Sequence, residues 1–125
     1  MHESKQTAKR DIEQRTFAFA LAVIHVCKQL DSLPGVGWGL AKQLLRSGTS
    51  IGANVEEAQA GQSRADFISK NAIALKEARE TRYWLRLLHA ADLVRSENVE
   101  RLILEADELT RILGAIVCNA RANAH

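Results

Sequence analysis

The amino-acid sequence predicts an all-α protein, an antiparallel up-down-up-down four-helix bundle. Apolar residues recur at intervals of three and four along four long segments, which is the period of amphipathic helices. No run of alternating β-branched residues is long enough to predict a strand. Short turns separate the four segments, so consecutive helices should run in opposite directions. The chain has 125 residues, 46% hydrophobic and 26% charged, and residues 1–125 are expected to form a single globular domain.

The first helix is expected at residues 7–31, and it carries more apolar surface than one bundle core uses. The stripe expected in the core comprises Ile12, Thr16, Phe19, Val23, Val26 and Leu30. A second apolar stripe comprises Phe17, Ala20, Ile24 and Cys27. Because large exposed apolar surfaces mark contacts with other proteins, the excess predicts an interface with a second subunit. The candidate interface residues are Phe17, Phe19, Leu21 and Trp38.

Turn and capping signals set the bounds of the other helices. Pro34 cannot continue a helix, and Gly61 should end the second one. Ser63 is positioned to cap the third helix and Ser96 to cap the fourth. These signals place the helices at residues 37–60, 64–92 and 97–121. The inner stripe of the last helix comprises Val99, Leu102, Ala106, Leu109, Leu113, Ile116 and Ala120.

The second helix has its weakest helix formers at its centre, in the segment SGTSIGAN at residues 47–54. Each glycine there costs about 1 kcal/mol relative to alanine. Gly48 and Gly52 are four residues apart and stack on adjacent turns, so another helix backbone can approach closely. The expected core stripe of this helix comprises Ala41, Leu44, Gly48, Ile51, Val55 and Ala58.

A polar stripe lies beside that core stripe and predicts a half-buried polar layer between the second and third helices. On the second helix the stripe includes Ser47 and the residues that follow it at helical spacing, and on the third helix two carboxylates are flanked by apolar side chains. The members expected in the layer are Ser50, Asn54, Glu57, Glu77 and Glu80. Buried polar groups need partners, and Lys76, Arg79 and Arg82 are close enough in sequence to pair with the carboxylates.

Basic residues share faces on the same two helices and form a candidate nucleic-acid-binding set. The set comprises Lys42, Arg46, Arg79, Arg82 and Arg86. A row of arginines can follow phosphates, and assembly into a ring would multiply it. The alternative is a solvated helix surface with local ion pairs. The formal net charge of +2 is too small to decide between them.

The sequence predicts no catalytic residues, no cofactor and no metal site. The Glu-x-x-His spacing of di-metal bundles fails, because Glu80 follows Glu77 at that spacing and Tyr83 follows Glu80. Cys27 and Cys118 lie in apolar stripes and are expected to be reduced and inert. The longest apolar run, residues 17–27, is shorter than the about 20 residues of a membrane helix. No signal peptide is visible, so the chain is expected to be cytoplasmic.

Three segments of the sequence carry a resemblance: LLRSGTSIGANVEEA (44–58), SRADFISKNAIALKEARETRYWLRLL (63–88) and EADELTRIL (105–113). They are similar to the four-helix-bundle family known as the 23S rRNA intervening-sequence proteins. The resemblance implies a compact antiparallel bundle that assembles into a homo-oligomeric ring, a pentamer in related proteins, and it implies a connection to RNA. The chain also resembles the accessory variability determinant of diversity-generating retroelements, whose basic pentamers bind nucleic acid and a reverse transcriptase.

Residues and resemblance together predict a non-enzymatic helical-bundle protein that forms a homo-oligomeric ring and acts as an RNA-associated binding or assembly module. The first alternative is a structural scaffold that binds only a protein partner. The second alternative, with less support from the residues, is a carboxylate metalloprotein.

Overall fold

The computed structural model contains four long α-helices: α1 (His2–Asp31), α2 (Val36–Ala60), α3 (Arg64–Ala91) and α4 (Ser96–Ala122). The structure describes residues 2–32, 35–61, 63–94 and 96–123, and none of them lies in a strand. The predicted all-α bundle is therefore confirmed. The expected bounds of α2, α3 and α4 are correct to within one residue at each end, but α1 begins five residues before the expected start.

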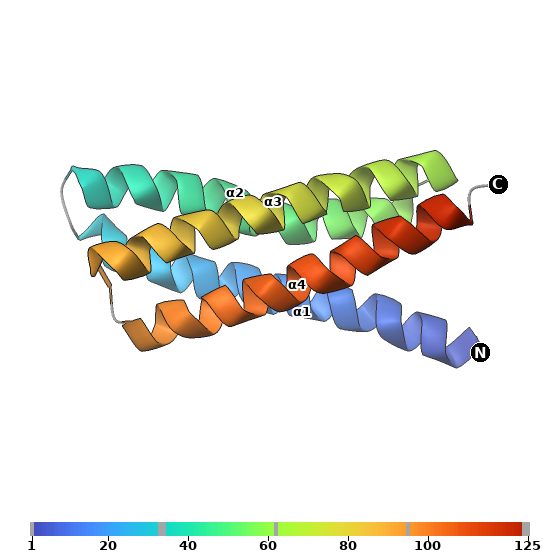
Figure 1. Ribbon diagram of the computed structural model, residues 1–125, viewed down its shortest axis with the longest axis horizontal. Coiled ribbons are helices and arrows are strands. Elements are labelled where there is room, and N and C mark those ends of the chain that lie inside the picture. The colour runs from blue at the N-terminus through green and yellow to red at the C-terminus, as the bar shows by residue number, and fades with distance from the viewer. Residues whose placement is uncertain (1, 33–34, 62, 95, 124–125) are drawn as a thin grey trace.

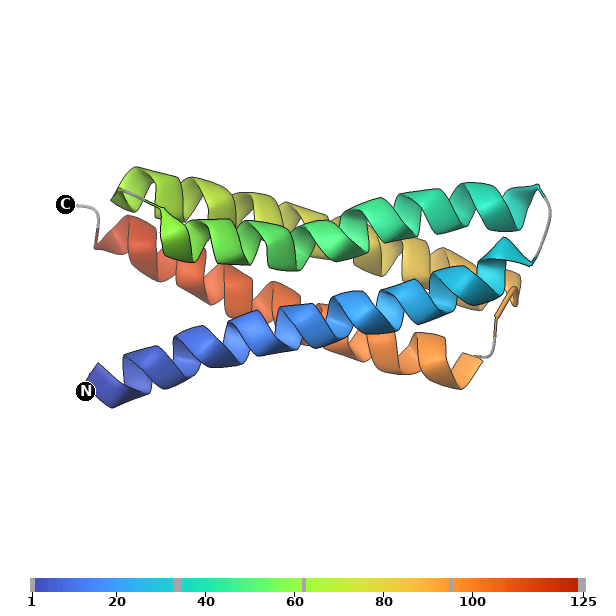
Figure 2. The ribbon, with the colours of Figure 1, turned by 180° about the vertical axis from the view of Figure 1, so that it is seen from behind.

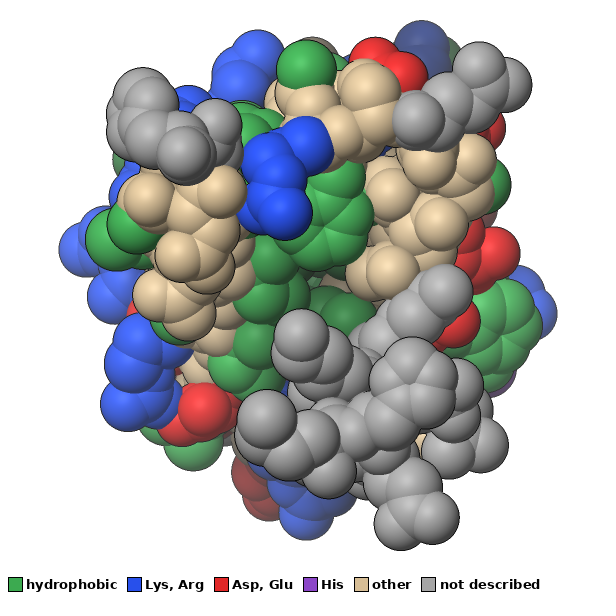
Figure 3. All heavy atoms as spheres, turned by 90° about the vertical axis from the view of Figure 1, so that its right-hand side faces the viewer, with side chains coloured by type: hydrophobic (Ala, Val, Ile, Leu, Met, Phe, Trp, Pro, Cys, Tyr) green, Lys and Arg blue, Asp and Glu red, His purple; other side chains and the backbone are tan. Residues whose placement is uncertain are grey.

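The helices alternate in direction and form two layers (Figures 1 and 2). α3 and α4 lie in front in Figure 1, and α1 and α2 lie behind them. Each helix packs against the next one in the chain, whereas α1 and α4 make the least extensive contact. The contact between α1 and α4 is small because the first half of α1 diverges from α4, as both views show. Figure 3 views that end of the bundle, with Lys and Arg side chains gathered mainly on the α3–α4 side and Asp and Glu mainly on the opposite side.

One hydrophobic core runs through the bundle and contains the expected stripes of α1 and α2. The stripe of α4 differs at one position, because Val117 is buried and Ile116 is only half-buried. On α1, Cys27 is buried, but Phe17 of the same expected stripe is 58% exposed. The core face of α3 was not predicted as such, and its apolar members are Ala74, Ala78, Leu85 and Leu88.

Helix ends follow the local signals in the sequence. The Ser63 hydroxyl accepts a hydrogen bond from the Asp66 backbone N–H at 3.1 Å, which confirms the predicted N-cap of α3. Gly61 ends α2 as predicted. Ser96 is the first residue of α4 rather than the residue before it, and Pro34 lies outside the described residues.

The glycines of α2 allow α1 to approach closely, as predicted. A Cβ built on Gly48 would lie 2.8 and 2.9 Å from the two methyl carbons of Val23. A Cβ on Gly52 would lie 3.3 Å from the Thr16 hydroxyl oxygen and 3.4 Å from its carbonyl carbon. The two glycines thus lie where α1 comes too close for a larger side chain to fit without a shift.

The two cysteines are free thiols in different surroundings, which corrects the expectation that both are inert. Cys27 is 5% exposed and its thiol donates to the Ala41 carbonyl oxygen at 3.4 Å, whereas Cys118 is exposed. Burial, with a smaller contribution from the charge of Asp31, raises the pKa of Cys27 to about 11.

A thiol-specific disulfide reagent at pH 8 is therefore expected to modify one cysteine per native chain and two per unfolded chain. The thiolate is the reactive form, and at pH 8 burial keeps Cys27 protonated and inaccessible. Cys118→Ser should remove the fast-reacting thiol and lower the total in denaturant from two thiols to one, since Cys27 alone remains. Equal reaction rates for both native thiols would contradict the buried placement of Cys27.

Candidate functional site

An open groove of about 570 Å³ lies between α3 and α4 and is lined mainly by arginines. From α3 it is lined by Arg79, Arg82, Tyr83 and Arg86, and from α4 by Asp107, Thr110 and Arg111. We refer to it as the arginine groove. The structure thus brings together three of the five predicted nucleic-acid-binding residues and adds Arg111, which was not predicted.

Helical spacing and the antiparallel register build this groove. Residues 79, 82 and 86 follow intervals of three and four, so their side chains share the edge of α3 that faces α4. Arg82 forms an ion pair with Asp107 through its Nε atom. The direction of the Nε–H bond does not make this contact a hydrogen bond. Seven residues, or about two turns, nearer the α3–α4 connection on each helix, His89 Nε2 lies 3.0 Å from Glu100 Oε1. These two contacts share one register and hold α3 against α4.

The charge of the arginine groove is positive. Arg82 is paired with Asp107 and Arg111 is paired with Glu108. Arg79 and Arg86 are exposed, and neither forms an ion pair with a described residue. Two guanidinium groups are thus available to an anion from solution, and each presents a planar fork of donors that suits a phosphate.

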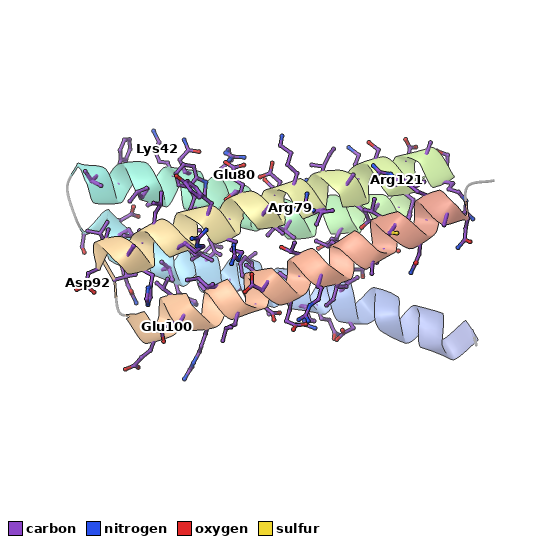
Figure 4. The ribbon with its side chains drawn as sticks, in the orientation of Figure 1. Lys42, Arg79, Glu80, Asp92, Glu100 and Arg121 are labelled. Carbon is purple, nitrogen blue, oxygen red and sulfur yellow. The ribbon has the colours of Figure 1, made fainter. Side chains whose placement is uncertain are left out.

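Lys42 and Arg46 lie elsewhere, so the predicted set does not form one surface. The Lys42 ammonium stacks over the Trp38 ring at 4.0 Å from its centroid, a cation–π contact. Figure 4 shows Lys42 toward the end of the bundle at which α2 begins, and Arg79 near its middle. Arg46 joins α2 to α3, with Nη1 lying 3.2 Å from Glu77 Oε2 and Nη2 paired with Glu80.

The polar layer between α2 and α3 is smaller than predicted and has different partners. Glu77 is 7% exposed, and its cation partner is Arg46 rather than Lys76, Arg79 or Arg82. Glu80 also accepts a hydrogen bond from the Trp84 indole N–H at 3.2 Å.

Three of the expected members of the layer form no side-chain hydrogen bond or ion pair with the described residues of α3. Ser50 and Asn54 are half-buried and donate to carbonyl oxygens of their own helix, those of Arg46 and Ser50. Glu57 is exposed and faces the α1 side of α2, because its position lies half a turn away from the core stripe. The fully buried polar contact of the layer is the hydrogen bond between Thr81 and Ser47, at 2.9 Å.

A second open groove, of about 500 Å³, lies between α1 and α2. Its lining includes Phe17, small residues such as Ala20 and Ala53, and the exposed carboxylates of Glu56 and Glu57. We refer to it as the acidic groove. It lies on the face that carries the predicted oligomer-interface residues.

Three of those four interface candidates are exposed. Phe17 is 58%, Leu21 46% and Trp38 54% exposed. Phe19 is 2% exposed, so its assignment to an interface is wrong. It belongs to the core stripe of α1, in which the sequence also placed it, and a side chain there cannot reach another subunit.

Among the residues whose side chains the structure describes, one ion pair joins α1 to α4. Arg15 Nη2 lies 2.6 Å and Nε 3.1 Å from the two carboxylate oxygens of Glu105. This bidentate pair raises the pKa of Arg15 above its ordinary value, mainly through the hydrogen bond to Glu105. It joins the middle of α1 to the middle of α4.

The described residues form neither a metal-binding cluster nor a membrane-spanning helix. In the parts of the chain that the structure describes, no three or more His, Cys, Asp or Glu side chains are grouped so as to hold a metal ion. The described helices likewise include none whose length and apolar content would let it traverse a lipid bilayer.

Comparison with known proteins gives the family. The 23S rRNA-intervening sequence protein family matches residues 8–115. The chain belongs to this family. A solved structure from the S23 ribosomal protein family, a protein of unknown function from Bacteroides thetaiotaomicron, is 40% identical. The match covers 88% of this chain and 97% of that one, with a TM-score of 0.80. No curated protein matches the chain.

Membership of the 23S rRNA-intervening sequence protein family confirms the resemblance noted in the sequence. The similarity to the accessory variability determinant of diversity-generating retroelements stays a prediction. The family description names no reaction, and the solved structure is described as having unknown function, so neither assigns a role to the arginine groove.

Sequence reasoning missed the cross-helix partners within this family fold. Asp107 and Arg111 lie on α4, and no local pattern links them to residues of α3. An explicit register could have found them. If α3 and α4 are antiparallel and joined by a short turn, residues equidistant from that turn lie opposite each other, as Arg82 and Asp107 do.

Proposed function

We propose that this chain is a non-enzymatic, cytoplasmic helical-bundle protein that assembles with copies of itself into a ring and binds RNA through the arginine groove. The observation that carries the proposal is the alignment of Arg79, Arg82, Arg86 and Arg111 along one open groove. Arg79 and Arg86 add two exposed positive charges to it.

Guanidinium groups in a groove suit a phosphate backbone for two reasons. Each can donate two parallel hydrogen bonds to one phosphate, and each phosphate that is neutralised releases condensed counterions. Arg79 and Arg86 are seven residues apart on one face of α3, which is about 10.5 Å along the helix axis. Tyr83 lies between them and is 52% exposed, so its ring adds an aromatic surface for a base.

Family membership supports the RNA part of this proposal. The family is named after an intervening sequence of 23S rRNA, and the 40% identical structure comes from a family named after a ribosomal protein. The exposed apolar side chains of α1 and α2 support the assembly part, since side chains of this size are usually covered in soluble proteins. In a ring each groove would be repeated once per copy, which raises the apparent affinity for a long anion.

Arg79→Glu/Arg86→Glu is expected to abolish salt-sensitive retention of RNA at about 50 mM salt and to lower the slope of log affinity against log salt by about 2 per chain. The measurement is filter retention of a labelled single-stranded RNA at several salt concentrations. The wild-type chain should bind at low salt and lose affinity steeply as salt rises.

The matched control is Lys76→Glu/Arg101→Glu, which changes the net charge equally at exposed positions outside the arginine groove. It should retain most of the wild-type binding. Absence of wild-type binding at low salt would overturn the RNA proposal, and so would equal losses in both double variants. A partner set from cell extract that survives nuclease treatment would instead favour a scaffold for a protein partner.

A further inference from the structure

The exposed face of α1 and α2 has two ends with opposite character. At one end lies the acidic groove, in which small side chains such as Ala20 and Ala53 leave an open space beside Phe17. Glu56 and Glu57 also line it and are both exposed. This end therefore combines an open space lined by apolar side chains with two negative charges.

The other end of the same face is aromatic and basic. Trp38 is 54% exposed and carries the Lys42 ammonium on its ring at 4.0 Å. Val36, at the start of α2, is 71% exposed, and Lys28 is exposed in the last turn of α1. Asp31 is the acidic residue at this end, and Lys28 and Lys42 outnumber it.

The spacing along α2 relates the two ends. Lys42, Thr49 and Glu56 are separated by seven residues each, so they lie on one stripe with Lys42 and Glu56 about 21 Å apart. Leu45 lies between the two ends on α2 and Leu21 is exposed on α1, at 41% and 46%. An apolar strip with opposite charges at its ends complements a second copy of itself.

We infer that the Trp38–Lys42 end of one copy docks into the acidic groove of another copy. The inference rests on the self-assembly part of the proposed function and names the surfaces that meet. The Trp38 ring fills the space beside Phe17, and Lys42 pairs with Glu56. The arginine groove lies on the opposite layer of the bundle and stays free for RNA.

The geometry of this contact determines the assembly that it builds. If the two ends of one copy engage two different neighbours, the contact is head-to-tail, and it builds a ring when the rotation between copies closes and an open filament when it does not. If both ends engage the same neighbour, with the two-fold axis near Thr49, the contact gives a dimer. The measured mass distinguishes these two arrangements, and the same residues meet in both.

A charge swap tests the pairing, with mass measured by analytical ultracentrifugation over a range of protein concentrations. Lys42→Glu and Glu56→Lys should each raise the dissociation constant of the assembly at least about tenfold, because each places like charges together. The combined variant Lys42→Glu/Glu56→Lys should return to within about threefold of wild type, since it restores opposite charges. Lys76→Glu, an exposed change on α3, is the control and should assemble normally.

The outcomes separate the two proposals. A wild-type chain that is monomeric at all concentrations overturns both the self-assembly and this docking. A wild-type assembly that neither single variant weakens overturns the docking alone. Two weakened single variants without recovery in the combined one also overturn the docking, provided that circular dichroism shows all variants folded.

Discussion

Gly48→Ala is expected to lower the free energy of unfolding by about 1–2 kcal/mol, although alanine is the better helix former. The new methyl would lie 2.8 and 2.9 Å from the two methyl carbons of Val23, which is fully buried. Val23 is β-branched and has few rotamers available in a helix, so α1 itself must shift. Overpacking costs about 1–3 kcal/mol, and a shift of a whole helix belongs in the upper part of that range. The gain in helix propensity, about 1 kcal/mol, offsets only part of this cost.

The control for this prediction is the same substitution at a glycine with room around it. Gly114 of α4 has no atom of another element within 4 Å of its built Cβ, and neither has Gly39 of α2. Gly114→Ala and Gly39→Ala should therefore stabilise the protein by about 0.5–1 kcal/mol. Urea unfolding followed by circular dichroism measures all three variants. A stabilising Gly48→Ala would contradict the close packing of α1 on α2.

Arg46→Met is expected to cost about 1–3 kcal/mol of unfolding free energy, because it leaves the Glu77 carboxylate buried without its cation. The Glu77 side chain is 10% exposed, while that of Arg46 is 48% exposed and continues to Glu80. Solvent screens the arginine, so the cost should lie below that of breaking a fully buried pair. The same unfolding experiment measures it, with Lys76→Met as an exposed control that should change stability by less than about 0.5 kcal/mol.

Replacing both partners shows whether the cost comes from the stranded carboxylate. Arg46→Met/Glu77→Met removes the charge that Arg46→Met leaves behind, so the double variant should recover most of the lost stability. A double variant less stable than Arg46→Met would mean that Glu77 has another role in the polar layer.

The parts of the fold that follow from sequence are those governed by local chemistry. Apolar spacing placed the core stripes of α1 and α2 correctly, and the Ser63 cap follows from a hydroxyl three residues before a carboxylate. The close approach at Gly48 was also predictable, because a glycine in the middle of a helix lowers its stability unless tight packing requires the missing side chain.

The parts that sequence did not predict depend on where the helices meet. α3 has small or polar residues on its core face, including Ala74, Ala78 and Thr81, so apolar spacing alone did not identify that face. Arg46 pairs with Glu77 across two helices, 31 residues apart, while the local alternatives Lys76, Arg79 and Arg82 face elsewhere. The arginine groove was predicted only in part. Its α3 residues follow from helical spacing, but its α4 residues follow only from the register of α3 on α4.

The two candidate surfaces depend on the same packing. The tight contact of α1 on α2 at Gly48 and Gly52 sets the shape of the acidic groove, whose lining includes Thr16 and Gly52. The Arg46 cluster and the Thr81–Ser47 hydrogen bond hold α2 on α3 and so position the layer that carries the arginine groove. A change that loosens the α1–α2 contact should therefore weaken assembly before it weakens RNA binding.

The most direct test of this account is a double-mutant cycle between Val23 and Gly48, measured by urea unfolding. Val23→Ala removes the two methyl groups that an alanine at position 48 would strike. The double variant should therefore be more stable than the sum of the two single changes predicts, by about 1–2 kcal/mol. Additivity within about 0.3–0.5 kcal/mol would mean that the two side chains do not meet, and would contradict the close approach of α1 to α2.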